Sequence, residues 1–341
     1  MLRYFLNRVM FMIPLVFLLS ALLFIYMRVL PGDPVAGILG PEATPELTAQ
    51  LRATFGLDQP ILSQYLIWIR DLFQGNLGIS YTSQQEITPL LIARIPATLQ
   101  LLLSGFLVSL TFGLPLGFLA GRKRGSVLDN VLSTFSLIGL STPIFWIGTL
   151  FVMVVGVSWR LLPAEGYVPF REDPLMSLKL TILPALTLGL VLAPYLARLT
   201  RAATIEIEYE SFMHQARANG LKNSTITFRY AARNVLPQIL VVLGMQLGGL
   251  LGGQVIVEQL FNWPGVGRLL IQGALQRDYP MVQAVILIIA ILFVLINLLA
   301  EILHALMDKR IIMKIRKSKS DQSLKNKKLA NHLMIKNLLD S

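Results

Sequence analysis

The chain of 341 residues contains no cysteine and only three histidines. Without thiols it can form no disulfide bond and no thiolate-ligated metal site. His214, His304 and His332 stand far apart in the sequence, and neither H-E-x-x-H nor G-x-S-x-G occurs. We therefore expect no metal, no cofactor and no catalytic residue, which argues against an intramembrane enzyme.

A phosphate-binding loop is also missing. No G-x-x-x-x-G-K-[ST] segment occurs in the chain, so the chain lacks the usual backbone cradle for ATP phosphates. Work driven by ATP hydrolysis would then depend on a partner subunit. The alternative, an ion-coupled secondary transporter, is expected to carry paired ionisable residues in mid-span. The apolar runs of this chain contain none at their centres.

Charged residues make up only 14% of the chain, against about 25% in soluble domains. Apolar residues make up 54% and gather in runs of the roughly 20 residues that cross a bilayer. The fourth run contains Pro184 and Pro194, which neighbouring helices make tolerable in a span. The sequence thus predicts an all-α polytopic membrane protein with six transmembrane helices, over 9–27, 98–120, 131–157, 180–197, 236–257 and 281–307.

The first run also has features of a signal peptide, because Arg3 and Arg8 form a positive segment before it. Against this, the run is as long as a span, no small-residue cleavage site closes it, and five more runs follow. We interpret it as an uncleaved transmembrane helix.

The distribution of the net charge of +11 predicts the orientation. With the N-terminus in the cytoplasm, the inside segments hold 21 Lys and Arg residues and the outside segments hold 9. This is the bias expected of cytoplasmic loops, so both termini are predicted to be cytoplasmic. Residues 308–341 alone hold ten of these cations, and attraction to lipid headgroups is the simplest role for this basic tail.

The outside segment 31–97 is predicted to contain two helices. Thr44-Pro45-Glu46 is a typical helix start, and Gly56 a typical end. A second helix over 60–73 has an apolar stripe at helical spacing. These helices are expected to pack on the outer ends of the spans, and the alternative is a helix that lies on the membrane surface. The outside loop 158–178 shows no periodicity.

Small and polar residues recur inside the spans. Gly113, Gly117 and Gly121 follow one another every fourth residue in the second span, which favours close helix packing. The fifth span repeats the pattern and adds two amides, so its residues are predicted either to pack helices or to line a translocation path: Gly244, Gln246, Gly248, Gly252 and Gln254. In the sixth span Asn297, Glu301 and His304 are expected to hydrogen-bond between helices, or to form a substrate or proton site.

The inside loop 198–235 is the most informative segment, because a plain connection needs only about 2–8 residues. Residues 209–221 have the composition of a short helix, and Gly220 suits the left-handed position that follows one. Such a helix would offer Phe212, Met213 and Ala216 to a partner groove. The alternative is a helix that lies on lipid.

This loop resembles the coupling loop of ABC importer permeases. The family's Glu-Ala-Ala falls on His214, Gln215 and Ala216, its glycine on Gly220, and its Leu-Pro on residues 236–237. Two of the three leading residues depart from that pattern. The form Ala-Arg-Ala-x-Gly-Leu over 216–221 looks like the dipeptide, oligopeptide and nickel branch.

Further segments are similar to the B-type permease of that branch, and the resemblance covers residues 1–310. They are Leu-Pro-Gly-Asp-Pro at 30–34, Phe-Gly-Leu-Asp at 55–58, Gly-Asn-Leu-Gly-Ile-Ser at 75–80, Phe-Asn-Trp-Pro-Gly-Val-Gly-Arg at 261–268 and Arg-Asp-Tyr-Pro at 277–280.

The resemblance implies the type I ABC importer transmembrane fold in a bacterial inner membrane. It implies an N-terminal helix with a periplasmic segment over 1–97, a transmembrane domain over 98–307 and a cytoplasmic tail over 308–341. The implied partners are a second homologous permease subunit, two cytoplasmic ATPase subunits and a substrate-binding protein on the outer side, with no nucleic acid. The implied cargo is a dipeptide or oligopeptide, with glutathione or a nickel chelate as alternatives. The implied ATPase-coupling residues are Phe212, Met213, His214, Gln215, Ala216, Arg217, Ala218, Asn219 and Gly220.

Overall fold

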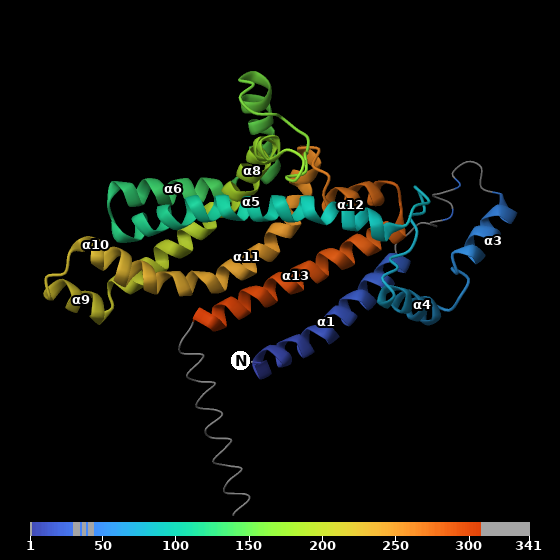
Figure 1. Cartoon of the computed structure of the whole chain (residues 1–341), viewed down its shortest axis with the longest axis horizontal. Coiled ribbons are helices and arrows are strands. Elements are labelled where there is room, and N and C mark those ends of the chain that lie inside the picture. The colour runs from blue at the N-terminus through green and yellow to red at the C-terminus, as the bar shows by residue number, and fades with distance from the viewer. Residues whose placement is uncertain (1, 30–34, 36–38, 40–43, 308–341) are drawn as a thin grey trace, which may run out of the picture.

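The computed structural model describes residues 2–29, 35, 39 and 44–307. Four continuous helices are long and apolar enough to cross a membrane: α1 (Leu2–Val29), α5 (Ile87–Arg122), α8 (Pro174–Glu208) and α13 (Tyr279–Met307). Figure 1 shows α1, α5 and α13 running along the long axis of the molecule. No β-strand occurs in the described part of the chain, apart from one isolated bridge between Ile79 and Glu86.

The third and fifth predicted spans are bent rather than straight. α6 (Val127–Ser141) is followed by α7 (Ile144–Leu150) and the π-helical turn η2 (Phe151–Ser158). The chain bends by 101° between α6 and the segment Ile144–Ser158. The break falls at Pro143, where no backbone N–H is available to continue the helix. The second pair bends by 44° and includes α11 (Arg233–Leu260). With each pair counted as one span, the six predicted spans are present.

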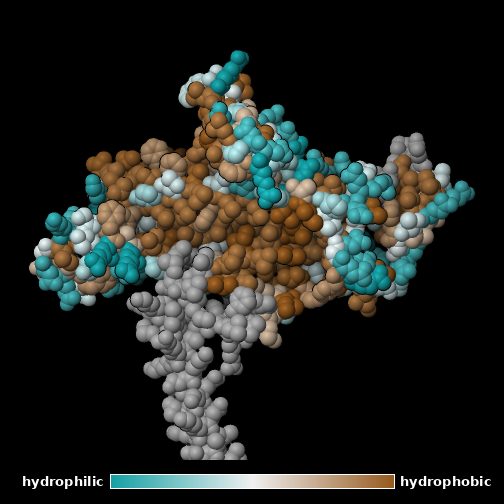
Figure 2. All heavy atoms as spheres, in the orientation of Figure 1, coloured by the Kyte–Doolittle hydropathy of each residue, from teal (hydrophilic) through white to brown (hydrophobic). Residues whose placement is uncertain are grey.

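The remaining helices gather at the two ends of this bundle. One end carries α9 (Ser211–Ala218), α10 (Asn223–Thr225) and the π-helical segment η3 (Ile226–Ala232). The opposite end carries α3 (Pro45–Thr54), α4 (Ile61–Phe73) and α12 (Val266–Leu275). Between them Figure 2 shows a broad hydrophobic band flanked by more hydrophilic surfaces at both ends. This distribution suits a protein whose long axis crosses the bilayer.

The pair α5 and α8 forms the centre of the fold, and glycines bring their backbones together. A Cβ atom added at Gly113 would lie 2.8 Å from the carbonyl oxygen of Ala193, and one added at Gly121 would lie 2.8 Å from that of Arg201. Only glycine allows such an approach. The expected packing role of the glycines of the second span is therefore confirmed. The core continues into Leu183, Leu188 and Phe261.

The outside segment follows the predicted pattern at its helix ends. Thr44 Oγ1 accepts a hydrogen bond from the N–H of Leu47 at 3.3 Å, and Gly56 has a φ of +64° just after α3. α8 is much longer than its predicted run, because Asp173 caps an earlier start and the helix continues to Glu208. The Leu-Pro-Gly-Asp-Pro segment at 30–34, the tail over 308–341 and the side chain of His304 lie outside the described residues.

Candidate functional site at the α9 end of the bundle

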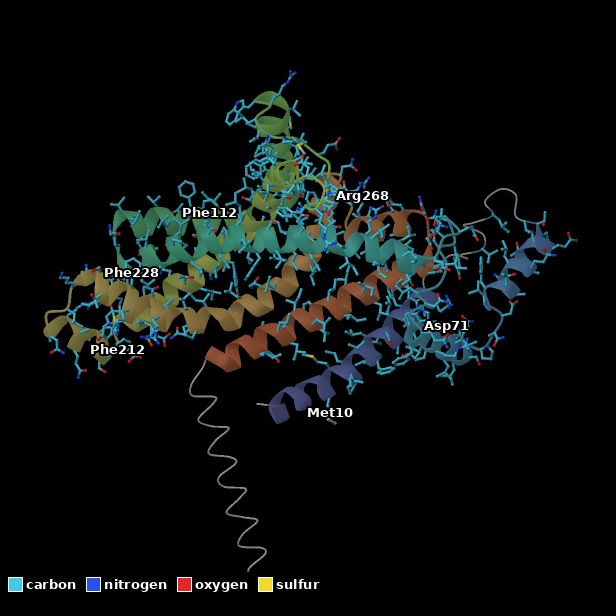
Figure 3. All side chains as sticks on the ribbon, in the orientation of Figure 1. Met10, Asp71, Phe112, Phe212, Phe228 and Arg268 are labelled. Atoms are coloured by element: carbon cyan, nitrogen blue, oxygen red, sulfur yellow. The ribbon has the colours of Figure 1, made fainter. Side chains whose placement is uncertain are left out.

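The long inside loop is folded as a continuation of α8 and three short helical elements. α8 runs to Glu208, α9 covers Ser211–Ala218, and α10 with η3 leads back into α11. This hairpin projects at one end of the molecule, where Figure 3 labels Phe212. The predicted short helix in this loop is confirmed.

The sharp end of α9 depends on Gly220. Its φ is +70°, in the left-handed region that glycine adopts at little cost. The N–H of Gly220 donates to the carbonyl of Arg217 at 3.0 Å, and the N–H of Leu221 donates to that of Ala216 at 3.3 Å. This pair of hydrogen bonds is the Schellman pattern of helix termination. The expected left-handed glycine cap is therefore confirmed.

The apolar face of α9 points inward, which corrects part of the sequence prediction. Met213 is 0% exposed and Ala216 is also buried, in a cluster with Ile207, Ile226 and Ala231. Met213 and Ala216 therefore hold α9 on its own chain and are not offered to a partner. Phe212 packs on the edge of the same cluster and is half-buried. The exposed residues of α9 and its cap are Ser211, His214, Gln215, Arg217, Ala218, Asn219 and Gly220.

A carboxylate joins α9 to the two central helices. Glu208 forms an ion pair of 2.8 Å with Arg122, the last residue of α5, and a second ion pair with Arg217 of α9. Arg122 also donates a hydrogen bond to the Asn223 side chain at 2.9 Å. The ends of α5, α8, α9 and α10 are thus connected through charged and polar side chains. Sequence reasoning missed this cluster, because it placed Glu208 inside the loop 198–235 and only the structure extends α8 to that residue.

A separate ion pair, between Arg201 and Asp129, fixes α6 beside α8. Arg201 donates two hydrogen bonds to Asp129, at 2.5 Å from Nε and 2.8 Å from Nη2. The Asp129 carboxylate also accepts the N–H of Gly125 at 3.0 Å. The short connection between α5 and α6 is therefore also attached to the C-terminal part of α8.

The predicted residues of the fifth span separate into two groups. Gly244 and Gly248 face α13, where added Cβ atoms would collide with Ala300 and Phe293, so these two glycines pack helices. Gly252 faces away from the rest of the described chain, since a Cβ there would meet no heavy atom within 4 Å. Gln246 is half-buried.

Gln254 is buried near the C-terminal end of α11, and its amide faces the Glu258 carboxylate one turn further along the same helix. Its Nε2 lies 3.3 Å from Oε1 of Glu258, and the same oxygen accepts a hydrogen bond from Thr98 at 2.8 Å. Oε2 of Glu258 accepts a hydrogen bond from the N–H of Arg268 at 2.9 Å. Trp263 closes this region by donating to the carbonyl of Ala97 at 2.9 Å. Gln254 is therefore part of an internal polar cluster that joins α5, α11 and α12.

In the sixth span, the hydrogen bond between helices expected of Asn297 is not present in the described part of the chain. The Asn297 side chain donates to the carbonyl of Phe293 in its own helix at 2.9 Å, so it does not use that amide group between helices. Glu301 is half-buried. Among the described residues no group of three His, Asp or Glu residues could hold a metal ion.

Comparisons with known proteins match nearly the whole chain. A family profile described as "Binding-protein-dependent transport system inner membrane component" matches residues 113–313, and a profile described as its N-terminal membrane component matches residues 1–102. A putative peptide transport system permease protein of Brucella abortus is 38% identical over 306 residues, which covers 90% of this chain and 98% of the relative.

Two more relatives and one solved structure are similar. The di/tripeptide transport system permease protein DppB of Pseudomonas aeruginosa is 37% identical, covering 91% of this chain and 99% of the relative. The glutathione transport system permease protein GsiC of Escherichia coli K12 is 35% identical with the same coverage. A chain of the MetNI methionine ABC transporter matches with a TM-score of 0.53 and 19% identity, over 64% of this chain and 96% of that chain, a likeness of fold.

Proposed function

This chain belongs to the family of binding-protein-dependent transport system inner membrane components, and on that premise we propose that it forms half of an ATP-driven import path for peptides. Its relatives carry names that refer to peptides, di/tripeptides and glutathione. Glutathione is itself a tripeptide, so all three names describe the same chemical class. A peptide is therefore our first candidate cargo, and a nickel chelate is the remaining alternative.

The observation that carries the proposal is the exposed, firmly attached helix α9. Its inward side is buried on the chain's own core, and its outward side presents His214, Gln215 and Ala218 at the end of the bundle. The chain has no phosphate-binding loop of its own. We assign this outward side, together with the edge of Phe212, to the contact with a cytoplasmic ATPase subunit.

The ion pairs of Glu208 connect α9 to the membrane-spanning helices α5 and α8. A displacement of α9 by an ATPase would act on Glu208 through Arg217, and on α5 through Arg122. The pair α5 and α8 is in close backbone contact at Gly113, so both helices would move together. Rigid rocking of such a unit is a known way to alternate access to a membrane path.

The other partners are assigned to the remaining surfaces. The side of α11 at Gly249 and Gly252 meets no neighbour within 4 Å in the described chain, which suits the path or a second permease subunit. The substrate-binding protein would approach the opposite end of the bundle, where α3 and α12 lie. An ion-coupled secondary transporter would need neither of these partners.

The test compares two substitutions of one residue. Gly220→Val forces a β-branched side chain into a left-handed conformation, at a cost of roughly 1–2 kcal/mol. Gly220→Asn is the matched control, because asparagine also occupies this position in helix caps. We expect Gly220→Val to reach the membrane at normal levels but to lose co-purifying ATPase and peptide uptake, while Gly220→Asn retains both.

The lipid-surface alternative for α9 predicts that both variants keep the ATPase. If Gly220→Val retains wild-type association and uptake, the assignment of α9 to the ATPase contact is wrong. The cargo is tested separately, by competition of a labelled dipeptide with glutathione and with a nickel chelate in reconstituted vesicles. If only the nickel chelate competes, the assigned cargo becomes a nickel chelate instead of a peptide.

A further inference from the structure

Helix α4 attaches to α1 through one of its sides. Tyr65 hydroxyl and Ser20 hydroxyl are 2.9 Å apart, and the ring of Tyr65 meets that of Phe24 at 5.4 Å between centroids. Trp68 adds a contact with Phe24 at 5.7 Å, and Arg28 donates to the Gln64 side chain at 2.9 Å. The side of α4 that carries Gln64, Tyr65 and Trp68 is therefore occupied by the chain itself.

A second side of α4 is apolar and largely exposed in the described part of the chain. Leu62, Leu66, Ile69 and Phe73 follow one another at spacings of four, three and four, which places them on one side of a helix. Leu62 is 69% exposed, Leu66 58% and Phe73 77%. An apolar surface of this kind marks a contact with a protein or a membrane.

The third side of α4 is mainly polar, and its one apolar residue, Ile67, is 42% exposed. Ser63, Arg70 and Gln74 repeat at spacings of seven and four, about a quarter turn beyond the apolar side. Arg70 is exposed and pairs with its neighbour Asp71 at 3.0 Å. α4 thus has one side toward α1, one apolar side and one polar side. This arrangement is typical of a helix at a membrane boundary. Figure 3 places Asp71 at the α4 end of the molecule.

The apolar side of α4 is continuous with the membrane surface of α1. The ring of Phe73 lies 6.2 Å from that of Phe17, which is itself exposed and belongs to the apolar span Met12–Val29. The residues of α1 that touch α4 extend from Arg28 to Phe17, about 16 Å of helix at 1.5 Å per residue. α4 therefore lies beside the outer half of the apolar span α1, whose other side packs on α13, and not above that span.

From this geometry we propose that Leu62, Leu66, Ile69 and Phe73 insert into the acyl region of the outer leaflet. The occupant of this side of α4 is lipid. The polar side with Arg70 faces the headgroups and water. α3 has no buried residue of its own, so the inserted α4 holds the outside segment to the membrane and keeps α3 at the surface.

The native chain contains no cysteine, so single-cysteine variants of the full-length chain test this directly. Leu66→Cys and Leu62→Cys report on the apolar side, and Arg70→Cys, one turn from Leu66, is the matched control. Each variant is labelled with an environment-sensitive fluorophore. The protein is then placed in nanodiscs of phosphatidylcholine and phosphatidylglycerol that contain lipid with a nitroxide on the acyl chain, and aqueous iodide is the second quencher.

We expect the nitroxide lipid to remove the fluorescence at positions 62 and 66, with little effect of iodide, and the reverse at position 70. Quenching by iodide at 66 as strong as at 70 would overturn the proposal, because that side would then face water. Protection of 66 from both quenchers would also overturn it, because a protein would then cover this side. Neither outcome depends on transport, so the proposed function is not at stake.

Discussion

Glu208, the last residue of α8, forms an ion pair of 2.8 Å with Arg122, the last residue of α5. Their side chains are only 16% and 15% exposed. Glu208 also pairs with Arg217 of α9, so one carboxylate serves two cations from two other helices. A shielded network of this kind is worth more than an isolated surface ion pair.

The first prediction concerns this carboxylate. Glu208→Gln removes the negative charge and leaves Arg122 and Arg217 facing each other without a counter-charge. We expect a loss of about 1–3 kcal/mol in the free energy of unfolding and a large drop in uptake, because α9 is no longer held to α5. Thermal unfolding in detergent and peptide uptake in vesicles measure the two effects.

Glu206→Gln is the matched control for that experiment. Glu206 lies two residues before Glu208 on the same helix, and its side chain is exposed. The two variants change the net charge equally, so a general electrostatic effect would act on both. If Glu208→Gln and Glu206→Gln transport equally well, the network does not carry the coupling.

The second prediction concerns the contact between α5 and α8. Gly113→Ala places a methyl group 2.8 Å from the carbonyl oxygen of Ala193, and the backbone there cannot move aside cheaply. We expect a destabilisation of about 1–3 kcal/mol, seen as a lower Tm. Gly249→Ala is the control, because a Cβ there meets no heavy atom within 4 Å of the described chain. An equal Tm for the two variants would contradict the close-packing account.

The third prediction concerns topology. Gln85→Cys, between α4 and α5, is expected to react with a membrane-impermeant maleimide in intact cells, because the charge bias places this segment outside. Gln215→Cys on α9 is expected to react only after the cells are opened. Both native side chains are exposed, so a difference in labelling reports the side of the membrane. Labelling of Gln215→Cys in intact cells would invert the orientation.

Local sequence signals predicted the elements that depend on local chemistry. The cap at Gly220, the N-cap at Thr44 and the apolar spans all follow from a few neighbouring residues, and the structure has each of them. The glycine spacing in α5 also predicted its packing, because a helix face is fixed by sequence period alone.

The features that sequence could not predict depend on the three-dimensional arrangement. The apolar residues of α9 could face a partner or the chain itself, and only the position of η3 shows that Met213 is buried. The ion pair of Arg122 with Glu208 joins two helix ends that are distant in sequence. The third span was predicted as one continuous run over 131–157, and its bend of 101° after Pro143 was not predicted, because α7 packs on α11, which is distant in sequence.

A cross-link from the outward side of α9 tests most directly whether this helix contacts the ATPase. Gln215→Cys in the full chain, co-expressed with its ATPase subunits, is treated with a short thiol-reactive photo-cross-linker. Phe228→Cys, from the same exposed end of the molecule but on η3 (Figure 3), is the control. We expect a cross-linked product with the ATPase from position 215 and none from position 228. No product from position 215, in a preparation that still transports peptide, would contradict the assignment of α9 as the helix that receives the ATPase.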